Sequence, residues 1–242
     1  MPDRSDQEEK LRLSKPEIHR LLLTAKEKWP HLHIFSMIAL NTLARPDAVL
    51  DLSPAQVDLD ERRIDLNPRG RKRTKKQRPV VPITDTLLPY LQAREVVRFV
   101  TWHGEPIASV KKGFATLVKA AGLPVEVTPY CLRHTMATEL RKRGVDHWEV
   151  QGFLGHRMPG VTERYAKYSP DYLSEGRQAI DDYFTELALS DQPRVIDLGD
   201  CVPPACHSSE TKKSAEADFS TISTVRMVGV TGIEPVTPTM ST

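Results

Sequence analysis

The chain has 242 residues, of which 39% are hydrophobic, and a formal net charge of +2, so it holds enough apolar material for one sizeable domain or two small ones. No stretch approaches the roughly 18 to 20 apolar residues that a membrane-spanning helix needs, and residues 1–10 are polar rather than a signal peptide, so we expect a cytoplasmic protein with no membrane partner. The three cysteines lack metal-site spacing, so we expect neither disulfides nor structural zinc.

Positive charge is concentrated in one segment. Residues 191–242 carry four basic and seven acidic side chains, a balance of −3, which leaves +5 for residues 1–190. Seven of the ten residues in RGRKRTKKQR, residues 69–78, are cationic. A cluster this dense attracts a polyanion such as DNA, although a solvated loop that only prevents aggregation would have the same composition.

The first elements are helices. Residues 1–12 are charged and predicted to be disordered. Ser14 and Glu17 have the spacing of a capping box, and the apolar residues that follow repeat at helical spacing until Pro30. Residues 31–44 are more apolar and predict a buried second helix.

Arg45 and Pro46 mark a helix junction between two apolar runs, because proline suits the first turn of a helix. A buried arginine without a partner is costly. The partner of Arg45 is therefore Asp47 or Asp51 within the chain, or a phosphate from outside.

The middle of the chain predicts a small antiparallel sheet. Residues 57–59 and 64–66 alternate apolar and polar side chains around a polar turn at residues 60–62, which is typical of a hairpin. The basic segment 69–78 follows, and residues 79–83 read as a third strand with proline at both ends. The basic loop should therefore project from the sheet.

The second half is again mostly helical, with apolar stripes and glycine or proline at the predicted ends. The tail from residue 190 is rich in Ser, Thr and Pro and predicted to be disordered. The predicted elements are a helix at 84–97, an extended pair at 98–107, and helices at 111–121, 128–143, 146–154 and 170–189.

Side chains in the stretch from Thr128 to Tyr165 have spacings that packing alone does not explain. Arg133 lies inside an amphipathic helix, His156 follows a Leu-Gly helix end, and Tyr165 comes nine residues later beside Arg164. Arginine binds phosphate bidentately, and tyrosine can attack it as a nucleophile. The segment therefore predicts half of a site that cuts phosphodiesters, with Tyr168 and Tyr172 as rival nucleophiles.

Together with Arg45, these residues resemble the catalytic domain of a tyrosine recombinase of the phage integrase family. Arg45 in LARPDAVLDL, Arg133 in YCLRHTMATEL, His156 in FLGHR and Tyr165 in TERYAKY match that family's pattern over roughly residues 13–186. The resemblance implies a mostly helical α+β domain at residues 13–189 with a three-stranded antiparallel sheet, followed by the tail at 190–242.

The chain departs from the family pattern in two respects. Tyr130 stands where the family usually has the first histidine of H-x-x-R, and its ordinary pKa of about 10 prevents it from acting as an imidazole base. It can still donate a hydrogen bond to phosphate, whereas His134 points about 100° away from Arg133 and is expected to be structural. The family also carries a helical DNA-clamping domain before the catalytic one, and this chain starts almost at the catalytic domain.

The resemblance implies a catalytic set of Arg45, Lys75, Tyr130, Arg133, His156 and Tyr165, with no metal and no cofactor. Tyr165 would attack the phosphodiester, the arginines and His156 would stabilise the developing charge, and a lysine in the basic loop would protonate the leaving 5′ oxygen. We assign this lysine as Lys75, with Lys76 and Lys72 as alternatives. Further contacts to double-stranded DNA are expected from Arg71, Lys72, Arg73, Lys76 and Arg78.

The sequence thus predicts a site-specific DNA recombinase or integrase that cleaves and rejoins strands through a 3′-phosphotyrosyl intermediate, working as a tetramer on DNA. Two alternatives stay open. One is a catalytically impaired DNA-binding remnant of an integrase without its clamping domain. The other is a type IB topoisomerase-like activity, which uses the same nucleophile without a particular target sequence.

Overall fold

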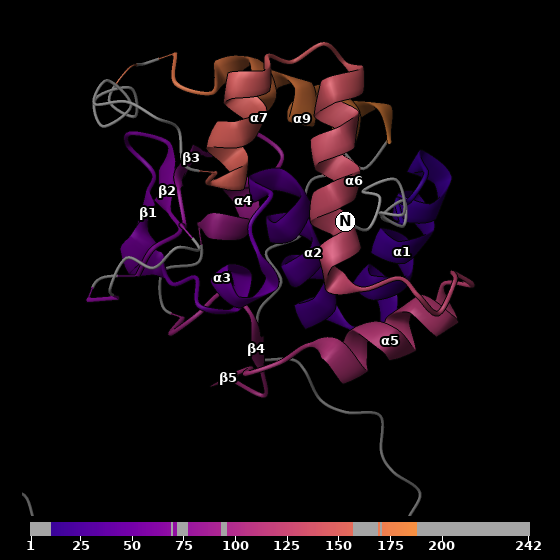
Figure 1. The fold of residues 1–242 in the computed structure, drawn as a ribbon. Helices are drawn as coiled ribbons and strands as arrows, with labels where there is room; N and C mark the ends of the chain where they lie inside the picture. The colour runs from indigo at the N-terminus through magenta and orange to yellow at the C-terminus, as the bar shows by residue number, and fades with distance from the viewer. Residues whose placement is uncertain are drawn as a thin grey trace, which may run out of the picture. The chain divides into compact units, whose positions relative to one another are not determined.

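Helix α2 (Pro30–Thr42) lies at the centre of the fold, and every residue from His31 to Thr42 is buried. It packs against α1 (Lys15–Lys28), α3 (Pro46–Leu50) and α6 (Pro129–Lys142), as the ribbon shows (Figure 1). This computed structural model describes residues 11–68, 70–71, 77–92, 96–156, 169 and 171–187. The predicted buried second helix is confirmed.

The capping box at the start of α1 is also confirmed. The Glu17 carboxylate accepts hydrogen bonds from the Ser14 amide at 2.7 Å and from its hydroxyl at 2.7 Å. The helix ends at Lys28, because Pro30 cannot continue it and instead occupies the first turn of α2.

The predicted three-stranded sheet is present with antiparallel order β1-β2-β3. Its strands are β1 (Val57–Asp58), β2 (Arg63–Asp65) and β3 (Val80–Pro82). Ile64 and Val81 are paired across β2 and β3, and both are fully buried. The alternation of the strands therefore turns one face of the sheet toward the core.

The later elements follow the prediction with two exceptions. The remaining elements are the 3₁₀ helix η2 (Pro54–Gln56), α4 (Leu88–Leu91), β4 (Thr101–Trp102) paired with β5 (Glu105–Pro106), α5 (Lys111–Ala120), α7 (His147–Leu154) and α9 (Ser174–Glu186). The final helix was predicted from residue 170 but begins at Ser174, because Leu173 adopts a left-handed conformation with φ 57°. The extended pair at 98–107 is confirmed as the β4–β5 hairpin.

The helix predicted at 84–97 is wrong in its length, because α4 spans only Leu88–Leu91. The preceding residues form turns instead. The Asp181 carboxylate of α9 accepts hydrogen bonds from the backbone amides of Asp85 at 3.0 Å and Thr86 at 2.9 Å. A tertiary contact therefore satisfies amides that the sequence pattern assigned to a helix.

The predicted disordered ends fall largely outside the described residues, which begin at Leu11 and end at Leu187. Leu11 and Arg12 are exposed. Within the part of the chain that the structure describes, no helix has the length and apolarity required to cross a membrane.

Candidate active site

Arg133 joins the ends of two other helices. Its side chain lies on α6 and is almost completely buried, with 4% of the residue exposed. Nη1 donates to the Leu43 carbonyl, and Nη2 donates to the Leu154 carbonyl at 2.7 Å. One guanidinium group thus bridges the C-terminal ends of α2 and α7.

These two carbonyls are available because both helices end there. Leu43 follows α2 in a left-handed conformation with φ 51°, and Gly155 follows α7 with φ 59°. The last carbonyls of a helix have no partner within it and carry partial negative charge. Among the described residues no carboxylate pairs with Arg133, so its positive charge is balanced by dipoles only.

Arg45 precedes α3 as its N-cap residue, two residues beyond Leu43. It is half-buried, and its Nη1 donates to the Gln77 carbonyl at 2.7 Å. Neither of the carboxylates proposed as its partner, Asp47 or Asp51, pairs with it within the described segments. Asp51 binds Arg78 and Arg98 instead. Within the described residues Nη1 is the Arg45 nitrogen that has a hydrogen bond, so its other donors are left for an anion from outside.

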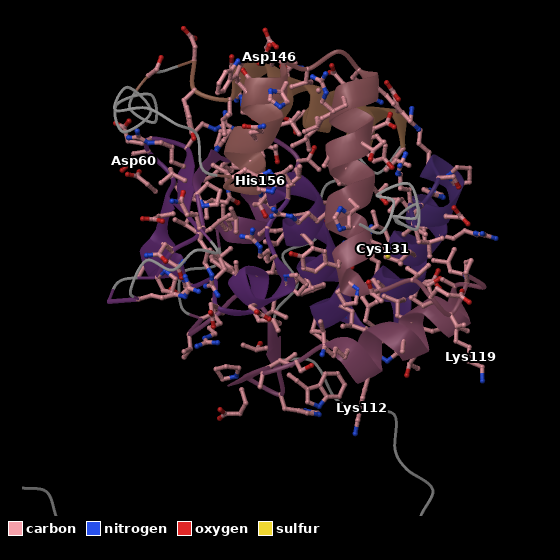
Figure 2. All side chains as sticks on the ribbon, viewed as in Figure 1. Asp60, Lys112, Lys119, Cys131, Asp146 and His156 are labelled. Atoms are coloured by element: carbon pink, nitrogen blue, oxygen red, sulfur yellow. The ribbon has the colours of Figure 1, made fainter. Side chains whose placement is uncertain are left out.

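His156 completes the cluster. It follows Gly155 at the end of α7 (Figure 2) and its side chain is exposed. Partial burial lowers its pKa below the ordinary value, and the positive charges of Arg133 and then Arg45 lower it further. Burial likewise lowers the pKa of Arg133 to about 10, with the charge of Arg45 as the second cause. At neutral pH the site thus holds two cations beside a neutral imidazole.

Tyr130 lies three residues before Arg133 and therefore on the same side of α6. It is 40% exposed, and its ring packs against that of His134, with centroids 5.3 Å apart. The phenol lies close enough to Arg133 to influence the pKa of its guanidinium. The predicted structural role of His134 agrees with this ring contact.

The remaining predicted catalytic residues lie outside the described residues. They are the nucleophile Tyr165, its rival Tyr168, and the general-acid candidates Lys75, Lys72 and Lys76. The predicted DNA contact Arg73 also lies outside the described residues, and all these roles stay predictions. The other rival, Tyr172, is half-buried and packs against the hydrophobic core.

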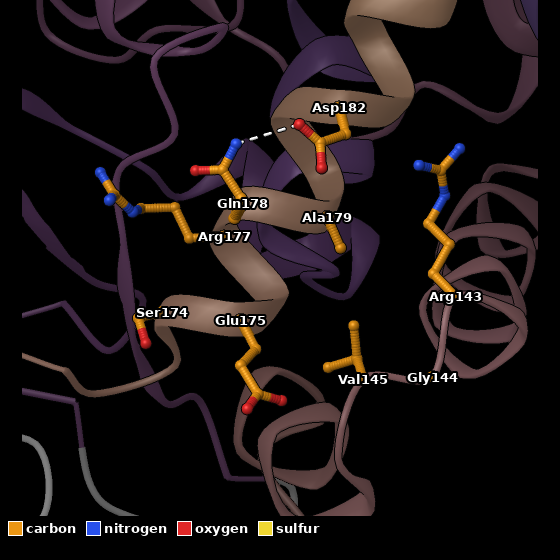
Figure 3. A pocket seen from close by; sticks show the side chains of 9 residues that line it. All are labelled: Arg143, Gly144, Val145, Ser174, Glu175, Arg177, Gln178, Ala179 and Asp182. Carbon is orange, nitrogen blue, oxygen red and sulfur yellow. Dashed lines mark hydrogen bonds between the residues drawn. The ribbon is translucent and has the colours of Figure 1, made fainter.

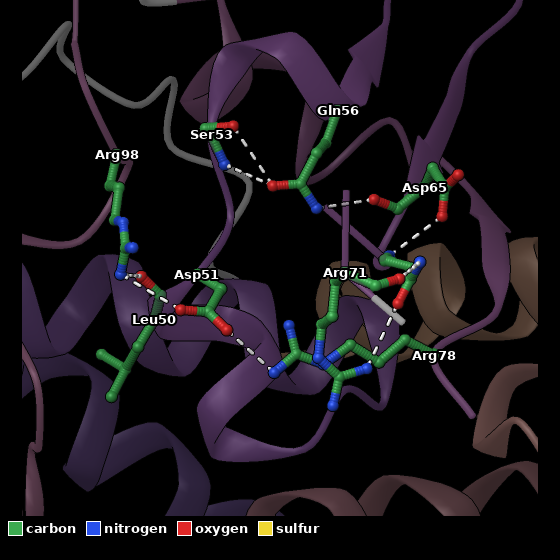
Figure 4. A network of polar contacts seen from close by, with 9 residues as sticks. Leu50, Asp51, Ser53, Gln56, Asp65, Arg71, Arg78 and Arg98 are labelled. Carbon is green, nitrogen blue, oxygen red and sulfur yellow. Dashed lines mark hydrogen bonds and ion pairs between the residues drawn. The ribbon is translucent and has the colours of Figure 1, made fainter. Parts of the chain in front are cut away.

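Two arginines of the basic segment are described, and both bond to protein groups (Figure 4). Arg71 Nη1 donates to the Asn67 side chain at 3.2 Å. Arg78 Nη2 donates to Asp51 at 2.9 Å, and the Arg78 side chain is only 7% exposed. The Arg78 guanidinium is thus held by Asp51, and a contact between Arg78 and DNA stays a prediction.

The sequence did not reveal the Gln77 carbonyl or the pair of Arg78 with Asp51 as parts of the site. A backbone carbonyl leaves no signal in the side-chain pattern. A separate surface hollow lies between α9 and the turn after α6 and is lined by Arg143, Gly144, Val145, Ser174, Glu175, Arg177, Gln178, Ala179 and Asp182 (Figure 3). None of the predicted catalytic residues that the structure describes, Arg45, Tyr130, Arg133 and His156, lines it.

The model of the phage integrase family matches residues 11–171, and the chain belongs to this family. Among its curated relatives, tyrosine recombinase XerD of Staphylococcus haemolyticus is 32% identical over 113 residues, 40% of this chain and 38% of the relative. Tyrosine recombinase XerA of Thermococcus kodakarensis is 28% identical over 176 residues, 69% and 61% of the two chains. The chain thus spans less than two thirds of these relatives.

Solved structures share the fold. The crystal structure of XerA recombinase matches with a TM-score of 0.51 at 21% identity, covering 73% of this chain and 64% of that one. The Tn1549 transposon integrase in complex with circular intermediate DNA matches with a TM-score of 0.54 at 19% identity, covering 73% and 68%. The mostly helical α+β fold with a small antiparallel sheet is therefore that of a tyrosine recombinase.

Proposed function

We propose that the chain cleaves and rejoins DNA strands at a specific site through a 3′-phosphotyrosyl intermediate. The observation that carries this proposal is that Arg45 and Arg133 both lie near His156. No carboxylate from the described residues neutralises either arginine. Like charges held together in a partly buried site favour binding of an anion. A phosphodiester is an anion that guanidinium groups bind well.

Each residue of the site has a role in this reaction. Tyr165 attacks phosphorus as its phenol proton passes to water, so that a bond from phosphorus to the tyrosine oxygen forms and the bond to the 5′ oxygen breaks. Arg45, Arg133 and neutral His156 donate hydrogen bonds to the non-bridging oxygens, where negative charge develops. The 5′ oxygen takes its proton from a lysine of the basic loop, for which Lys75 remains our assignment, with Lys72 and Lys76 as alternatives.

The partner in this proposal is double-stranded DNA. Family membership supports it, as does the density of positive charge in residues 69–78. The Tn1549 integrase, which shares the fold, was solved with circular intermediate DNA. By the same resemblance, we propose that the protein works as a tetramer on two duplexes.

Covalent trapping tests the proposal without a complete recombination reaction. Wild type and Tyr165→Phe are incubated with a pool of nicked duplexes whose sequence is randomised around the break. Cleavage next to the nick releases a short fragment and leaves the protein attached to DNA. We expect a denaturation-resistant adduct with wild type only, and the DNA recovered from it identifies the target.

The other outcomes separate the alternatives. DNA binding without an adduct would refute strand cleavage and favour the DNA-binding remnant. Adducts recovered on DNA of every sequence, with relaxation of supercoiled plasmid, would favour the topoisomerase-like activity. An adduct that persists in Tyr165→Phe would move the nucleophile to another tyrosine, with Tyr168 as the next to test.

A further inference from the structure

Three residues at the end of the basic segment, Gln77, Arg78 and Pro79, form the segment that we call the loop stem. It contacts three other parts of the site. The Gln77 carbonyl accepts a hydrogen bond from Arg45 at 2.7 Å. Arg78 binds Asp51, and Pro79 packs against Gly155. The loop stem therefore lies between Arg45 and the residue that precedes His156.

The contact with Gly155 is very close. A Cβ atom built on Gly155 would lie 2.7 Å from Pro79 Cδ and 2.9 Å from the Gln77 carbonyl oxygen. Only glycine allows the end of α7 to approach the loop stem this closely, and its φ of 59° also favours glycine. The position of the loop stem thus limits where His156, the next residue, can lie.

Helix α3 is tied to the loop stem at both of its ends. Its N-cap residue, Arg45, bonds to the Gln77 carbonyl, and its C-cap residue, Asp51, bonds to the Arg78 side chain (Figure 4). Because α3 has only five residues, the two contacts hold consecutive residues of the loop stem against one short, rigid element. Movement of the stem would break both.

Asp51 forms ion pairs with Arg78 and with Arg98, and only the pair with Arg78 holds the loop stem. The Arg78 side chain is 7% exposed, and its Nη1 is buried without a hydrogen-bond partner in the described part of the chain. Its guanidinium thus depends on Asp51. Arg98 binds the other oxygen of Asp51 at 3.1 Å and the Leu50 carbonyl at 3.2 Å, and among the described residues it has no hydrogen bond or ion pair with the stem.

We propose that Asp51 and Arg78 are positioning residues that hold the Gln77 carbonyl where it orients Arg45 toward the scissile phosphate. This inference rests on the proposed function, because it assigns Arg45 to that phosphate. It predicts that the ion pair acts on the reaction through Arg45. Small displacements of a group that stabilises the transition state cost up to about 100-fold in rate.

Two variants of the pair and a matched control test this inference. Asp51→Asn and Arg78→Gln each weaken the contact, whereas Arg98→Gln removes a cation from the same carboxylate without touching the loop stem. On the duplex recovered by trapping, we expect the first two to slow adduct formation by about 10-fold or more, and Arg98→Gln to change it by less than about 2-fold. DNA affinity and the thermal midpoint show that each variant binds and folds.

A double-mutant cycle then asks whether the pair acts through Arg45. In an Arg45→Lys background, which keeps the charge but loses the planar fork, Asp51→Asn should cause less than about a 2-fold further loss. An equal loss in both backgrounds would overturn the inference, as would equal effects of Asp51→Asn and Arg98→Gln.

A second readout does not depend on catalysis. A guanidinium that donates to a fixed carbonyl rotates slowly, which nitrogen-15 NMR detects as separate Nη signals. We expect the Arg45 signals, assigned with Arg45→Lys, to be separate in wild type and Arg98→Gln and averaged in Asp51→Asn. If the Arg45 signals behave in this way but wild type forms no adduct with DNA, the proposed function is refuted, while Asp51 and Arg78 still position Arg45. Unchanged Arg45 signals in Asp51→Asn would overturn the positioning pair.

Discussion

Replacing Arg133 with methionine separates the effect of this residue on the free energy of unfolding from its effect on the rate of strand cleavage. Methionine is an unbranched side chain that fills irregular space, so Arg133→Met removes the charge and keeps much of the packing. It deletes hydrogen bonds to the carbonyls of Leu43 and Leu154. We expect strand cleavage to be lost while the fold is retained.

The expected stability follows from two opposing effects. Two hydrogen bonds from a charged donor contribute about 1.5 to 3 kcal/mol each. Against this, a buried cation costs several kcal/mol when it has no ionic partner, and Arg133 has none among the described residues although it is only 4% exposed. We therefore expect the free energy of unfolding to change by less than about 2 kcal/mol. Adduct formation should slow by about 100-fold to 1,000-fold, as for loss of a transition-state donor.

Arg143→Met is the matched control, because Arg143 is the C-cap residue of the same helix. Arg143 binds Glu139 at 3.2 Å and Glu186 at 2.6 Å and belongs to no predicted site. Its loss should lower the free energy of unfolding by about 1 kcal/mol and leave adduct formation unchanged. Urea denaturation and trapping measure both quantities. A loss above about 4 kcal/mol in Arg133→Met would show that Arg133 is mainly structural, and unchanged adduct formation would remove it from the reaction.

Four further substitutions, one of them a control, test the packing around the site and the core. Gly155→Ala should destabilise the fold by about 2 to 4 kcal/mol and block adduct formation, because its Cβ would meet Pro79. Gly122 is the control, since it has a similar φ of 63° but lies in open space. Gly122→Ala should lower the free energy of unfolding by only about 1 kcal/mol, as measured by thermal or urea denaturation. Asp181→Asn should lower the free energy of unfolding by about 1 to 3 kcal/mol, since its carboxylate accepts from two backbone amides. Burial lowers the pKa of His33 to about 4, whereas in the unfolded chain this histidine takes up its proton near the ordinary value of 6.5. The free energy of unfolding should therefore fall by up to about 3 kcal/mol as the pH drops from 6.5 to 4. In His33→Gln this contribution to the pH dependence should be missing.

Each of these expectations has a contrary outcome. Equal losses in Gly155→Ala and Gly122→Ala would mean that the backbone conformation, and not the contact with the loop stem, explains the requirement for glycine. Unchanged stability in Asp181→Asn would show that the amides are equally well solvated without it. Parallel curves of stability against pH for wild type and His33→Gln would show that this histidine titrates alike in the folded and unfolded chain.

Local signals in the sequence were sufficient for most of the fold. The capping box of Ser14 and Glu17, the alternation around Ile64 and the Thr-Pro start of α6 each depend on residues within one or two turns of each other. Such patterns do not depend on the rest of the chain. They failed between residues 84 and 97, where α4 spans only Leu88–Leu91 and the amides of Asp85 and Thr86 bind Asp181, about a hundred residues away.

The sequence by itself determined which side chains could serve the reaction. Arg45, Arg133 and His156 were identified by type and spacing, and the structure places all three in one electrostatic neighbourhood. Only the tertiary structure decided what each of them binds. Asp51 was a plausible partner of Arg45 from sequence, yet it pairs with Arg78 and Arg98, because the choice among several arginines depends on distances in space.

The same reason explains why the loop stem could not be predicted. Its main contact to the site is the carbonyl of Gln77, and a backbone carbonyl is present at every residue whatever the side chain. The closeness of Gly155 to Pro79 likewise arises where α7 meets the sheet. Residue types therefore defined the chemistry available to this chain, and the packing of α3, α7 and the sheet decided how its arginines and histidine are held.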